Sequence, residues 1–497
     1  PRPAPPGSAS FGENLRTLLR TPGLADQRGL GDRFDHSVGA GAVLIPYGGA
    51  TQRTPSEANV YLLPTTTRTT TASILAHGFN PQESAANPYL GGLYAVVEAT
   101  ARLVACGGKA DRAHYSLQEY FQRLEQDPQR WGQVVAALLG AHHGLKALGR
   151  AAIGGKDSMS GSFNDLHVPP TLVAFAVGTV NVEQVRSPEF KRAGDRLYRL
   201  RCPSDEFGRP DLAIFQANNE FLRQHNGQLQ SIRALRAGGL ALALYECALG
   251  NGLGVNVRAA ELFRPEYGGY LISSRDELPA FGNLQYLGEV SAEGTLTING
   301  TSAPLAELYG QARATLAGVY ELFAPADPRP APALATRPQP LRRPSLKKAQ
   351  PRVCLPVFFG MNSELDTARA FSNAGALVQE SVFCQRPGTN DLEESLQRLE
   401  KTIDNSEIFV LCGGFSAGDE PDGSAKFIVN VLNSPRLREA LERFHARDGL
   451  MLGICNGFQA LLKGGFFDTA TGEVATLVHN RIGRHVSRLA TTVVSNK

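Results

Sequence analysis

Cys455 has the sequence surroundings of a nucleophile. It follows an apolar run, Leu450–Ile454, that predicts a buried parallel strand, and it precedes an apolar-periodic segment, Phe458–Leu462, that predicts a helix. Gly453 and Gly457 lie two residues away on either side, so the backbone is free to form a strained turn that projects the thiol from a sheet edge. The helix N-terminus would favour a thiolate. The alternative is an inert cysteine buried at a tight turn.

A second glycine-rich loop, Cys412–Asp419, follows the apolar run Ile408–Leu411. The carboxyl ends of parallel strands gather ligand sites at one sheet edge, so this loop is expected near the thiol. A backbone N–H from Gly413 or Gly414, with that of Asn456, would supply the two donors of an oxyanion hole. The alternative is a plain glycine-rich turn.

A third loop, Ile153–Gly161, consists mostly of small residues and contains one cationic and one carboxylate side chain. Backbone N–H groups and Lys156 suit a phosphate, and Asp157, which precedes Ser158, suits magnesium. The loop lacks the Walker A pattern, so a turn with an incidental ion pair is the alternative. His36, next to Asp35, is either a contact for a substrate phosphate or sugar or a structural histidine.

Strands and helices must position these loops, and changes in the sequence pattern divide the chain into regions. Residues 324–351 contain eight prolines among 28 residues, which predicts a solvated, semi-rigid linker. After the linker, the strand and helix patterns that begin at Arg352 alternate as in a parallel sheet. Before it the pattern changes near Ser187; the predicted strands are 42–46 and 171–177, and the predicted helices are 90–106 and 131–148.

Charge and composition narrow the function classes. The 497 residues carry 50 basic and 47 acidic side chains, a net charge of +3, and the linker alone carries +5, so the remainder is slightly acidic. Outside the linker there is no basic cluster interleaved with aromatics, which argues against nucleic-acid binding. Seven scattered cysteines without a CxxC pair favour a reducing cytoplasm, and no apolar run is long enough for a membrane span.

The segments Gly453–Gln459 and Cys412–Asp419, in this order and about 40 residues apart, resemble the class I glutamine amidotransferase domain of the phosphoribosylformylglycinamidine synthase family of purine biosynthesis. The resemblance implies that Cys455 attacks the carboxamide of glutamine and releases ammonia. It also implies an oxyanion-stabilising or glutamine-binding role for four residues, namely Gly413, Gly414, Asn456 and Gln459.

The sequence departs from this family after the cysteine. The family's base is a histidine in an H-x-E motif, but the histidines that follow here are His479 and His485, and the one glutamate is Glu473. None fits the motif. We therefore expect a truncated amidotransferase domain and no glutamine hydrolysis by these 497 residues alone.

Earlier segments resemble the second synthetase half of the same family, which is similar to aminoimidazole ribonucleotide synthetase. The matching segments are 34–38, 87–89, 155–160, 168–171 and 237–240. The implied fold class is α/β and α+β, a two-domain synthetase-like unit followed by a truncated flavodoxin-like parallel-sheet domain. The implied domains are 29–184, 185–323 and 352–497, with 1–28 as the tail of a missing upstream region and 324–351 as the linker.

The nucleotide region departs from the family as well. Family members carry a metal-binding glutamate with an asparagine four residues later, and here Glu98 is followed by Arg102. A later acidic motif is replaced by Ala234–Gly239, which contains Arg236. Glu98 remains the candidate metal ligand, but our hypothesis is that Arg102 and Arg236 replace the metal cations in a structural pocket. The alternative is an exposed helix pair between Glu98 and Arg102.

The resemblance implies part of a cytoplasmic ligase that joins ammonia from glutamine to formylglycinamide ribonucleotide at the expense of ATP. The implied cofactors are ATP and Mg²⁺, and Asp35, His36, Lys156, Asp157 and Ser158 are the candidate nucleotide or substrate contacts. The implied partner is the missing N-terminal half of the same enzyme, with neither nucleic acid nor membrane. The alternatives are another ATP-using enzyme of the superfamily fused to an amidotransferase-like domain, or a non-catalytic half that braces a catalytic partner.

Overall fold

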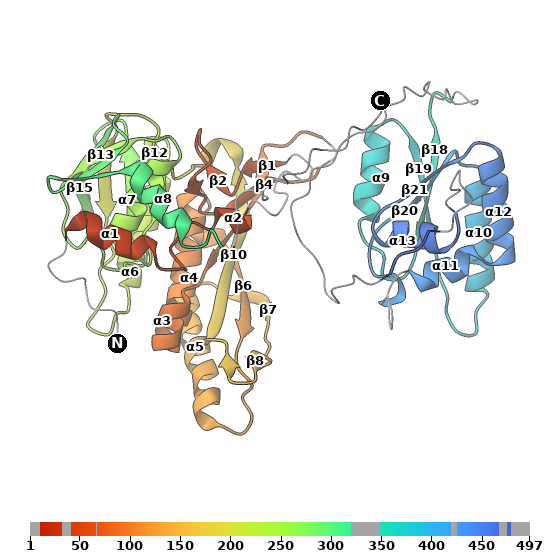
Figure 1. The fold of residues 1–497 in the computed structure, drawn as a ribbon, viewed down its shortest axis with the longest axis horizontal. Helices are drawn as coiled ribbons and strands as arrows, with labels where there is room; N and C mark the ends of the chain where they lie inside the picture. Colours follow the sequence, from red (N-terminus) through yellow and green to blue (C-terminus); the bar gives the residue numbers. More distant parts are fainter. Residues whose placement is uncertain are drawn as a thin grey trace. The chain divides into compact units, whose positions relative to one another are not determined.

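The computed structural model describes residues 10–31, 41–65, 67–319, 348–418, 425–466 and 475–478. These residues fall into two compact units, one within residues 1–327 and the other within residues 328–487 (Figure 1). We describe each unit by itself. The finer domain boundaries expected from the sequence stay predictions, and the proposed linker lies mostly outside the described residues.

The first unit is built on two mixed sheets. One has the order β1-β4-β5-β10-β6-β7, antiparallel except for the β6–β7 pair. Its strands are β1 (Ala42–Leu44), β4 (Asn59–Leu62), β5 (Thr71–Gly78), β10 (Thr171–Asn181), β6 (His114–Tyr120) and β7 (Ala152–Lys156). Two short hairpins, β2 (Tyr47–Gly48) with β3 (Thr54–Pro55) and β8 (Ser162–Phe163) with β9 (Leu166–His167), accompany this sheet.

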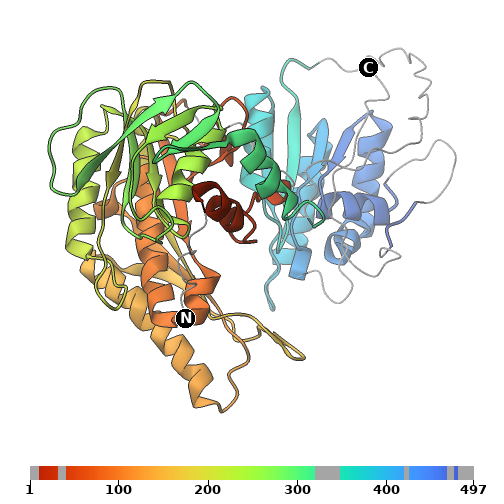
Figure 2. The ribbon, with the colours of Figure 1, turned by 60° about the vertical axis from the view of Figure 1, so that its left-hand side comes forward.

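Two long helices cover one face of this sheet, α4 (Pro88–Ala105) and α5 (Pro128–Ala147), and the short α3 (Pro81–Ala86) precedes them (Figure 2). Each long helix has a proline in its first turn and a capping side chain before it. Asn87 accepts a hydrogen bond from the N–H of Leu90 at the start of α4, and Asp127 accepts one from the N–H of Gln129 at the start of α5. α4 is mostly apolar and is buried from Leu90 to Ala105, so it is the central helix of this core.

The second sheet has the order β12-β14-β11-β15-β13-β16-β17. Its strands are β11 (Arg196–Leu200), β12 (Leu229–Ala234), β13 (Gly254–Val257), β14 (Tyr270–Ser274), β15 (Leu284–Ser291), β16 (Thr295–Ile298) and β17 (Thr301–Pro304). The helices of this part are α1 (Phe11–Leu19), α2 (Arg28–Gly31), α6 (Leu212–His225), α7 (Gly239–Leu249) and α8 (Leu305–Ala314). α7 is buried throughout and packs against β12, which brings the loop after β12 close to α4.

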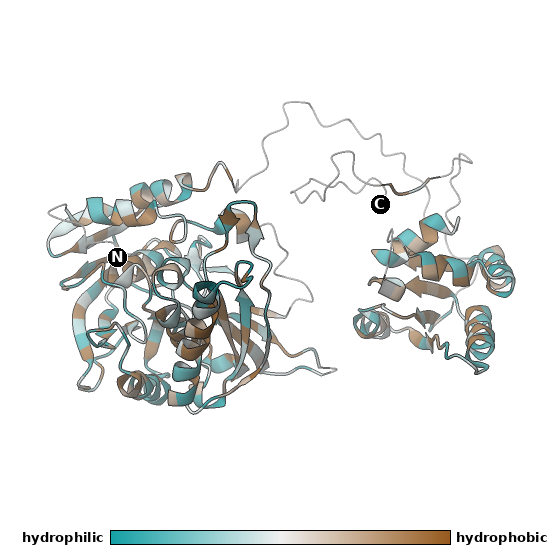
Figure 3. Ribbon diagram, turned by 90° about the horizontal axis from the view of Figure 1, so that it is seen from below, coloured by the Kyte–Doolittle hydropathy of each residue, from teal (hydrophilic) through white to brown (hydrophobic). Residues whose placement is uncertain are grey.

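The second unit is a parallel sheet flanked by helices, with brown apolar strands inside and teal patches on the outer helices (Figure 3). The sheet order is β19-β18-β20-β21, the arrangement of a flavodoxin-like sheet. The strands are β18 (Arg352–Val357), β19 (Leu377–Val382), β20 (Ile408–Leu411) and β21 (Leu450–Gly453). The helices are α9 (Glu364–Asn373), α10 (Asp391–Asp404), α11 (Lys426–Leu432), α12 (Pro435–Ala446) and α13 (Asn456–Lys463).

These two units confirm the predicted α/β and α+β class, but one strand prediction is wrong. Leu450–Ile454 was expected to form a buried strand, and β21 instead stands last in the sheet order with Leu450 65% and Leu452 42% exposed. A strand at the edge of a parallel sheet has a neighbour on one side only, so an apolar run there does not guarantee burial.

The outer face of α5 exposes large apolar side chains to solvent, and one of them is Trp131, which is 52% exposed. The indole Nε1–H of Trp131 donates to the carbonyl oxygen of Glu125 at 3.1 Å, which holds the ring near the start of the helix. Among the described residues, no helix combines the length and the apolar character needed to cross a membrane.

Candidate functional site

Cys455 occupies the turn between β21 and α13 with φ 51° and ψ −110°, a positive-φ conformation that non-glycine residues rarely adopt. Its side chain is exposed, so the inert buried cysteine of the alternative interpretation is wrong. A Cβ at Gly457 would lie 2.2 Å from the carbonyl oxygen of Leu411, and one at Gly453 would lie 2.7 Å from that of Gly457. Both glycines are therefore required by close backbone approach, as a nucleophile elbow needs.

The glycine loop after β20 lies beside this cysteine, as the sequence predicts. A Cβ built on Gly413 would lie 3.3 Å from the Cβ of Cys455, so the two turns are in contact. Gly414 has φ 131°, and its neighbours are the backbone of Gly360 and Met361 in the loop after β18. The N–H of Asn362 donates to the carbonyl oxygen of Gly413 at 3.1 Å, which fixes the loop against its neighbour.

Asn456 joins the glycine loop to the first turn of α13. Its buried side chain accepts a hydrogen bond from the backbone N–H of Ser416 at 3.3 Å and donates to Oε1 of Gln459 at 3.0 Å. All four residues expected around the thiol, Gly413, Gly414, Asn456 and Gln459, therefore lie at this sheet edge. In the described part of the second unit, no histidine forms a hydrogen bond with Cys455, and His479 and His485 lie outside the described residues.

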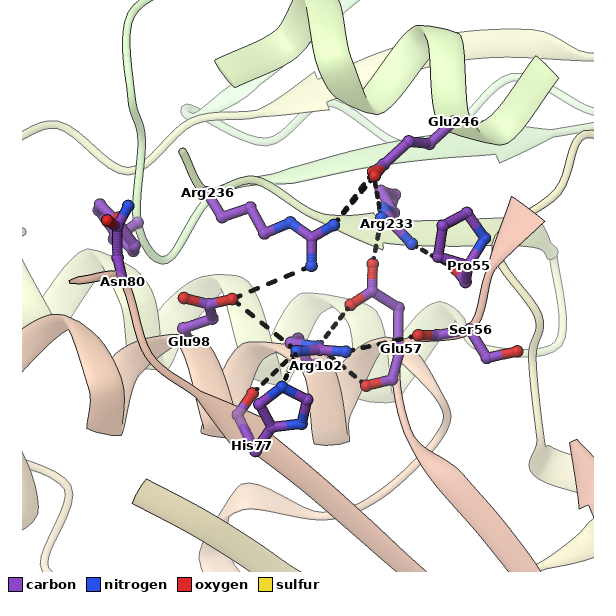
Figure 4. Close-up of polar contacts among 11 residues, drawn as sticks. Pro55, Ser56, Glu57, His77, Asn80, Glu98, Arg102, Arg233, Arg236 and Glu246 are labelled. Atoms are coloured by element: carbon purple, nitrogen blue, oxygen red, sulfur yellow. Dashed lines mark hydrogen bonds and ion pairs between the residues drawn. The ribbon is translucent and has the colours of Figure 1, made fainter. Parts of the chain in front are cut away.

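The first unit contains a separate cluster of six buried or nearly buried ionic side chains (Figure 4). The Glu98 carboxylate lies 3.9 Å from Arg102 and 4.0 Å from Arg236, so the predicted pairing of these three residues is present. Glu98 and Arg102 are only 5% and 8% exposed, and the exposed helix pair of the alternative interpretation is wrong. We call this cluster the ion ring; its members are Glu57, Glu98, Arg102, Arg233, Arg236 and Glu246.

Burial and charge act in opposite directions on the carboxyl groups of the ion ring. Burial raises the pKa of Glu98, although the charges of Arg236 and Arg102 oppose that shift. At Glu246 burial also works towards a higher pKa, but the charges of Arg233 and Arg236 outweigh it and the pKa is lowered. His77 lines the same region, and desolvation together with the positive charges of Arg102 and Arg236 lowers its pKa to about 3.

A cavity of about 390 Å³ lies beside the ion ring. Arg102, Arg236, Glu98 and Glu246 line it from the ring side, and the ring of Tyr245 lines it from α7. The hydroxyl group of Tyr245 is buried and has no hydrogen-bond partner among the described residues. The aromatic and charged lining suits a small polar molecule.

The predicted phosphate loop Ile153–Gly161 is partly a strand, because Ala152–Lys156 forms β7 at the edge of the first sheet. Lys156 and Asp157 are exposed; Lys156 Nζ donates to the backbone carbonyl of Asp157 at 3.1 Å, so the contact is not a side-chain ion pair. The hydroxyl groups of Ser158 and Ser160 are 2.8 Å apart. Asp35 and His36 lie outside the described residues, and their proposed roles stay predictions.

Sequence reasoning missed three members of the ion ring, namely Glu57, Arg233 and Glu246. Each is buried, and each reaches its partners from a different element: the end of the β3 hairpin, β12 and α7. A charged residue inside an otherwise apolar segment, such as Glu246 in the run Leu240–Leu249, was the available signal, because a buried charge needs a partner.

Comparisons with known proteins bear on the family that this chain resembles. Residues 350–497 match the family of CobB/CobQ-like glutamine amidotransferase domains. A Thermus thermophilus protein described as phosphoribosylformylglycinamidine synthase subunit PurL is 27% identical over 282 residues, which are 52% of this chain and 37% of that protein. The chain is similar to phosphoribosylformylglycinamidine synthase. This similarity confirms the resemblance predicted from the sequence motifs.

A second phosphoribosylformylglycinamidine synthase subunit PurL, from Zymomonas mobilis, is 28% identical over 305 residues, which are 54% of this chain and 40% of the relative. Among solved structures, PurLQS of Thermotoga maritima aligns with a TM-score of 0.42 and 17% identity, over 54% of this chain and 41% of that chain. The chain thus spans about 40% of the length of these PurL relatives.

Proposed function

We propose that this chain is part of an ATP-dependent ligase of de novo purine biosynthesis. The reaction would convert formylglycinamide ribonucleotide, glutamine and ATP into formylglycinamidine ribonucleotide, glutamate, ADP and phosphate. The observation that carries this proposal is the exposed, strained Cys455 at the strand end of a glutamine-amidotransferase-like unit. The similarity of half of the chain to PurL subunits supports the purine substrate.

In the second unit, the Cys455 thiolate would attack the carboxamide carbon of glutamine. Backbone N–H groups of Gly414 and Asn456 would stabilise the oxyanion of the tetrahedral intermediate, and Gln459 would help to hold the substrate. Collapse of the intermediate breaks the carbon–nitrogen bond, releases ammonia and leaves a glutamyl thioester, which water hydrolyses to glutamate. Protonation of the leaving ammonia requires an acid, and no described histidine is bonded to this thiol.

We therefore propose that these 497 residues by themselves do not hydrolyse glutamine. In the synthetase part, ATP would phosphorylate the amide oxygen of formylglycinamide ribonucleotide, and ammonia would then displace phosphate. Lys156, Asp157 and Ser158 are proposed contacts for the nucleotide or substrate, together with Asp35 and His36. Mg²⁺, when bound with ATP, would shield the phosphate charges. The proposed partner is the remainder of a longer enzyme, and the proposed location is the cytoplasm.

A second candidate role concerns the first unit alone, which we propose as a non-catalytic half that braces a catalytic partner. The observation that favours this role is the ion ring, because each of its carboxylates faces arginine nitrogens. The two roles are compatible, since a bracing half and an active amidotransferase unit share one chain.

Labelling with a diazoketone analogue of glutamine tests the amidotransferase role. Cys455 and Cys384 are the exposed cysteines of the chain, and the other five are buried. We expect one label per chain at Cys455, identified by peptide mass spectrometry, because only this thiol lies at a glutamine-binding turn. Cys384→Ser should retain the label, and Cys455→Ser should lose it.

A simple alkylating reagent provides the matched control, because it should modify both exposed cysteines regardless of a glutamine site. Labelling of Cys384 by the glutamine analogue, or no label at Cys455, would contradict the proposal. Release of glutamate from glutamine by the isolated chain, if abolished in Cys455→Ser, would contradict the proposed lack of turnover while supporting the nucleophile.

A further inference from the structure

The ion ring is a closed cycle of alternating charges (Figure 4). Each glutamate bridges two arginines: Glu57 bridges Arg102 and Arg233, Glu98 bridges Arg102 and Arg236, and Glu246 bridges Arg233 and Arg236. Representative N···O distances are 3.2 Å for Arg102–Glu57, 2.9 Å for Arg233–Glu57 and 3.1 Å for Arg236–Glu246. In their ionised forms the three carboxylates and three guanidinium groups sum to zero charge.

The cycle joins two parts of the first unit. Glu57, Glu98 and Arg102 come from the loop after β3 and from α4, beside the first sheet, whereas the other three members come from β12, the loop after it and α7, beside the second sheet. Backbone carbonyl groups satisfy further N–H donors, because Arg102 also donates to Glu57 and His77, and Arg233 donates to Pro55 at 2.6 Å. Arg102 and Arg233 are thus each held by backbone carbonyl groups as well as by carboxylates.

This arrangement does not fit a magnesium ion. Mg²⁺ takes about six oxygen ligands in octahedral geometry, and it binds through carboxylate oxygens that are not already engaged. The side chains of Glu57, Glu98 and Glu246 all face guanidinium nitrogens, which would repel a divalent cation. Within the described ranges, no group of three or more His, Cys, Asp or Glu side chains is arranged to hold a metal ion.

We propose that the ion ring takes the place of a divalent cation in the first unit, so that the adjoining cavity operates without a metal. Guanidinium groups supply the positive charge that the carboxylates require, and their fixed fork geometry links the two sheets at the same time. A ligand entering the cavity meets Arg236 rather than a metal ion. The inference rests on the proposed function only for the expectation that Mg²⁺ accompanies ATP.

Manganese binding to the whole chain tests the absence of a metal site. Mn²⁺ is the probe, and electron paramagnetic resonance of free Mn²⁺ counts the ions bound by the wild-type protein and by Glu98→Gln. We expect the same Mn²⁺ binding curve for both proteins. We also expect Mn²⁺ to change the Tm of the wild-type protein and of Glu98→Gln by the same amount. Loss of one Mn²⁺ site in Glu98→Gln would overturn the proposal, because it would place a cation against that carboxylate.

A double-mutant cycle tests whether the ring members neutralise one another. Glu98→Gln and Arg236→Gln should each lower Tm by about 2 °C or more. The decrease in Tm of the double variant should be clearly smaller than the sum of the two single decreases, because the double variant removes one charge of each sign. The matched control is the exposed pair Glu220 and Arg223, whose Gln variants should combine additively. Additive losses at the ring would overturn the proposal.

The metal test needs only the wild-type protein and one variant, so it stands if the Arg236 variant fails to fold. Its outcome is also separate from that of the amidotransferase proposal. A Mn²⁺ ion found against Glu98 would leave the labelling of Cys455 unchanged, and an unlabelled Cys455 would leave the ion ring unchanged.

Discussion

The backbone of Cys455 has a positive φ of 51°, and such a conformation in a non-glycine residue costs of order 1–3 kcal/mol. The surrounding glycines permit this turn, and the glycine loop holds it from the other side. Gly414 is the tightest point of that loop, because a Cβ there would lie 2.6 Å from the carbonyl oxygen of Gly360 and 2.7 Å from the Cα of Met361.

Gly414→Ala should therefore displace the loop from its position beside the thiol. We expect at least a tenfold slower labelling of Cys455 by the glutamine analogue, measured by mass spectrometry, together with a loss of about 2 kcal/mol in unfolding free energy. Gly375→Ala is the control, because Gly375 also has a positive φ but a Cβ there meets no atom within 4 Å. Equal labelling rates in the two variants would contradict the role given to the loop.

Single residues also mark how far sequence reasoning extended. The elbow at Cys455 and the pair of Glu98 with Arg102 follow from local spacing, so both were predictable. Arg233 and Glu246 were not, since their partners come from separate elements that only the tertiary fold brings together. The same reason explains why the alternative of an exposed Glu98 pair failed: burial of α4 depends on what packs around it.

At the scale of elements, apolar runs predicted where strands lie along the chain but not their place in the sheet. β20 has the predicted bounds and β18 begins at the predicted Arg352, whereas β21 is an exposed edge strand because sheet order is not encoded in the run itself. The closest helix crossing, between α4 and α5, depends on two glycines. A Cβ at Gly92 would lie 2.1 Å from the carbonyl oxygen of Ala137, and one at Gly140 would lie 1.9 Å from that of Tyr89.

Gly140→Ala should push these helices apart. We expect a loss of about 2–3 kcal/mol in unfolding free energy, because the contacted atom is a backbone carbonyl that cannot rotate away. Gly132→Ala on the same helix should gain about 0.5–1 kcal/mol, since a Cβ there meets nothing within 4 Å and alanine favours the helix. Urea unfolding of both variants measures the difference, and a stabilised Gly140→Ala would contradict the close crossing.

At the scale of the molecule, the burial of His77 beside the arginines of the ion ring makes the stability of the first unit depend on pH. The pKa of His77 is about 3 in the fold against an ordinary value of 6.5. Below pH 6.5 the imidazole of His77 therefore stays neutral in the folded protein, whereas in the unfolded chain it takes up a proton. The contribution of His77 is present above pH 6.5 and is lost as the pH falls towards 3. Because the pKa of Glu246 is lowered from its ordinary value of 4.5, the contribution of Glu246 to stability is lost only as the pH falls below about 4.5.

Between about pH 6.5 and pH 5, comparison with a His77 variant isolates the contribution of His77, because buried carboxyl groups with a raised pKa, such as Glu98, are present in both proteins. We expect the unfolding free energy of the wild-type protein to fall across this interval and that of His77→Asn to fall less, because asparagine takes up no proton. Urea denaturation at about pH 7 and about pH 5 provides the measurement. Identical decreases in the two proteins would contradict the environment assigned to His77.

The position of Trp131 has a consequence for optical experiments on the whole chain. The chain contains one tryptophan, and it lies on the outer face of α5 in the first unit, with its indole N–H bonded to a backbone carbonyl of the same unit. Intrinsic indole fluorescence consequently reports the environment of this one helix start. Emission spectra follow the melting of the unit that carries the ion ring, while the amidotransferase-like unit is better followed by maleimide dyes on its exposed thiols, Cys384 and Cys455.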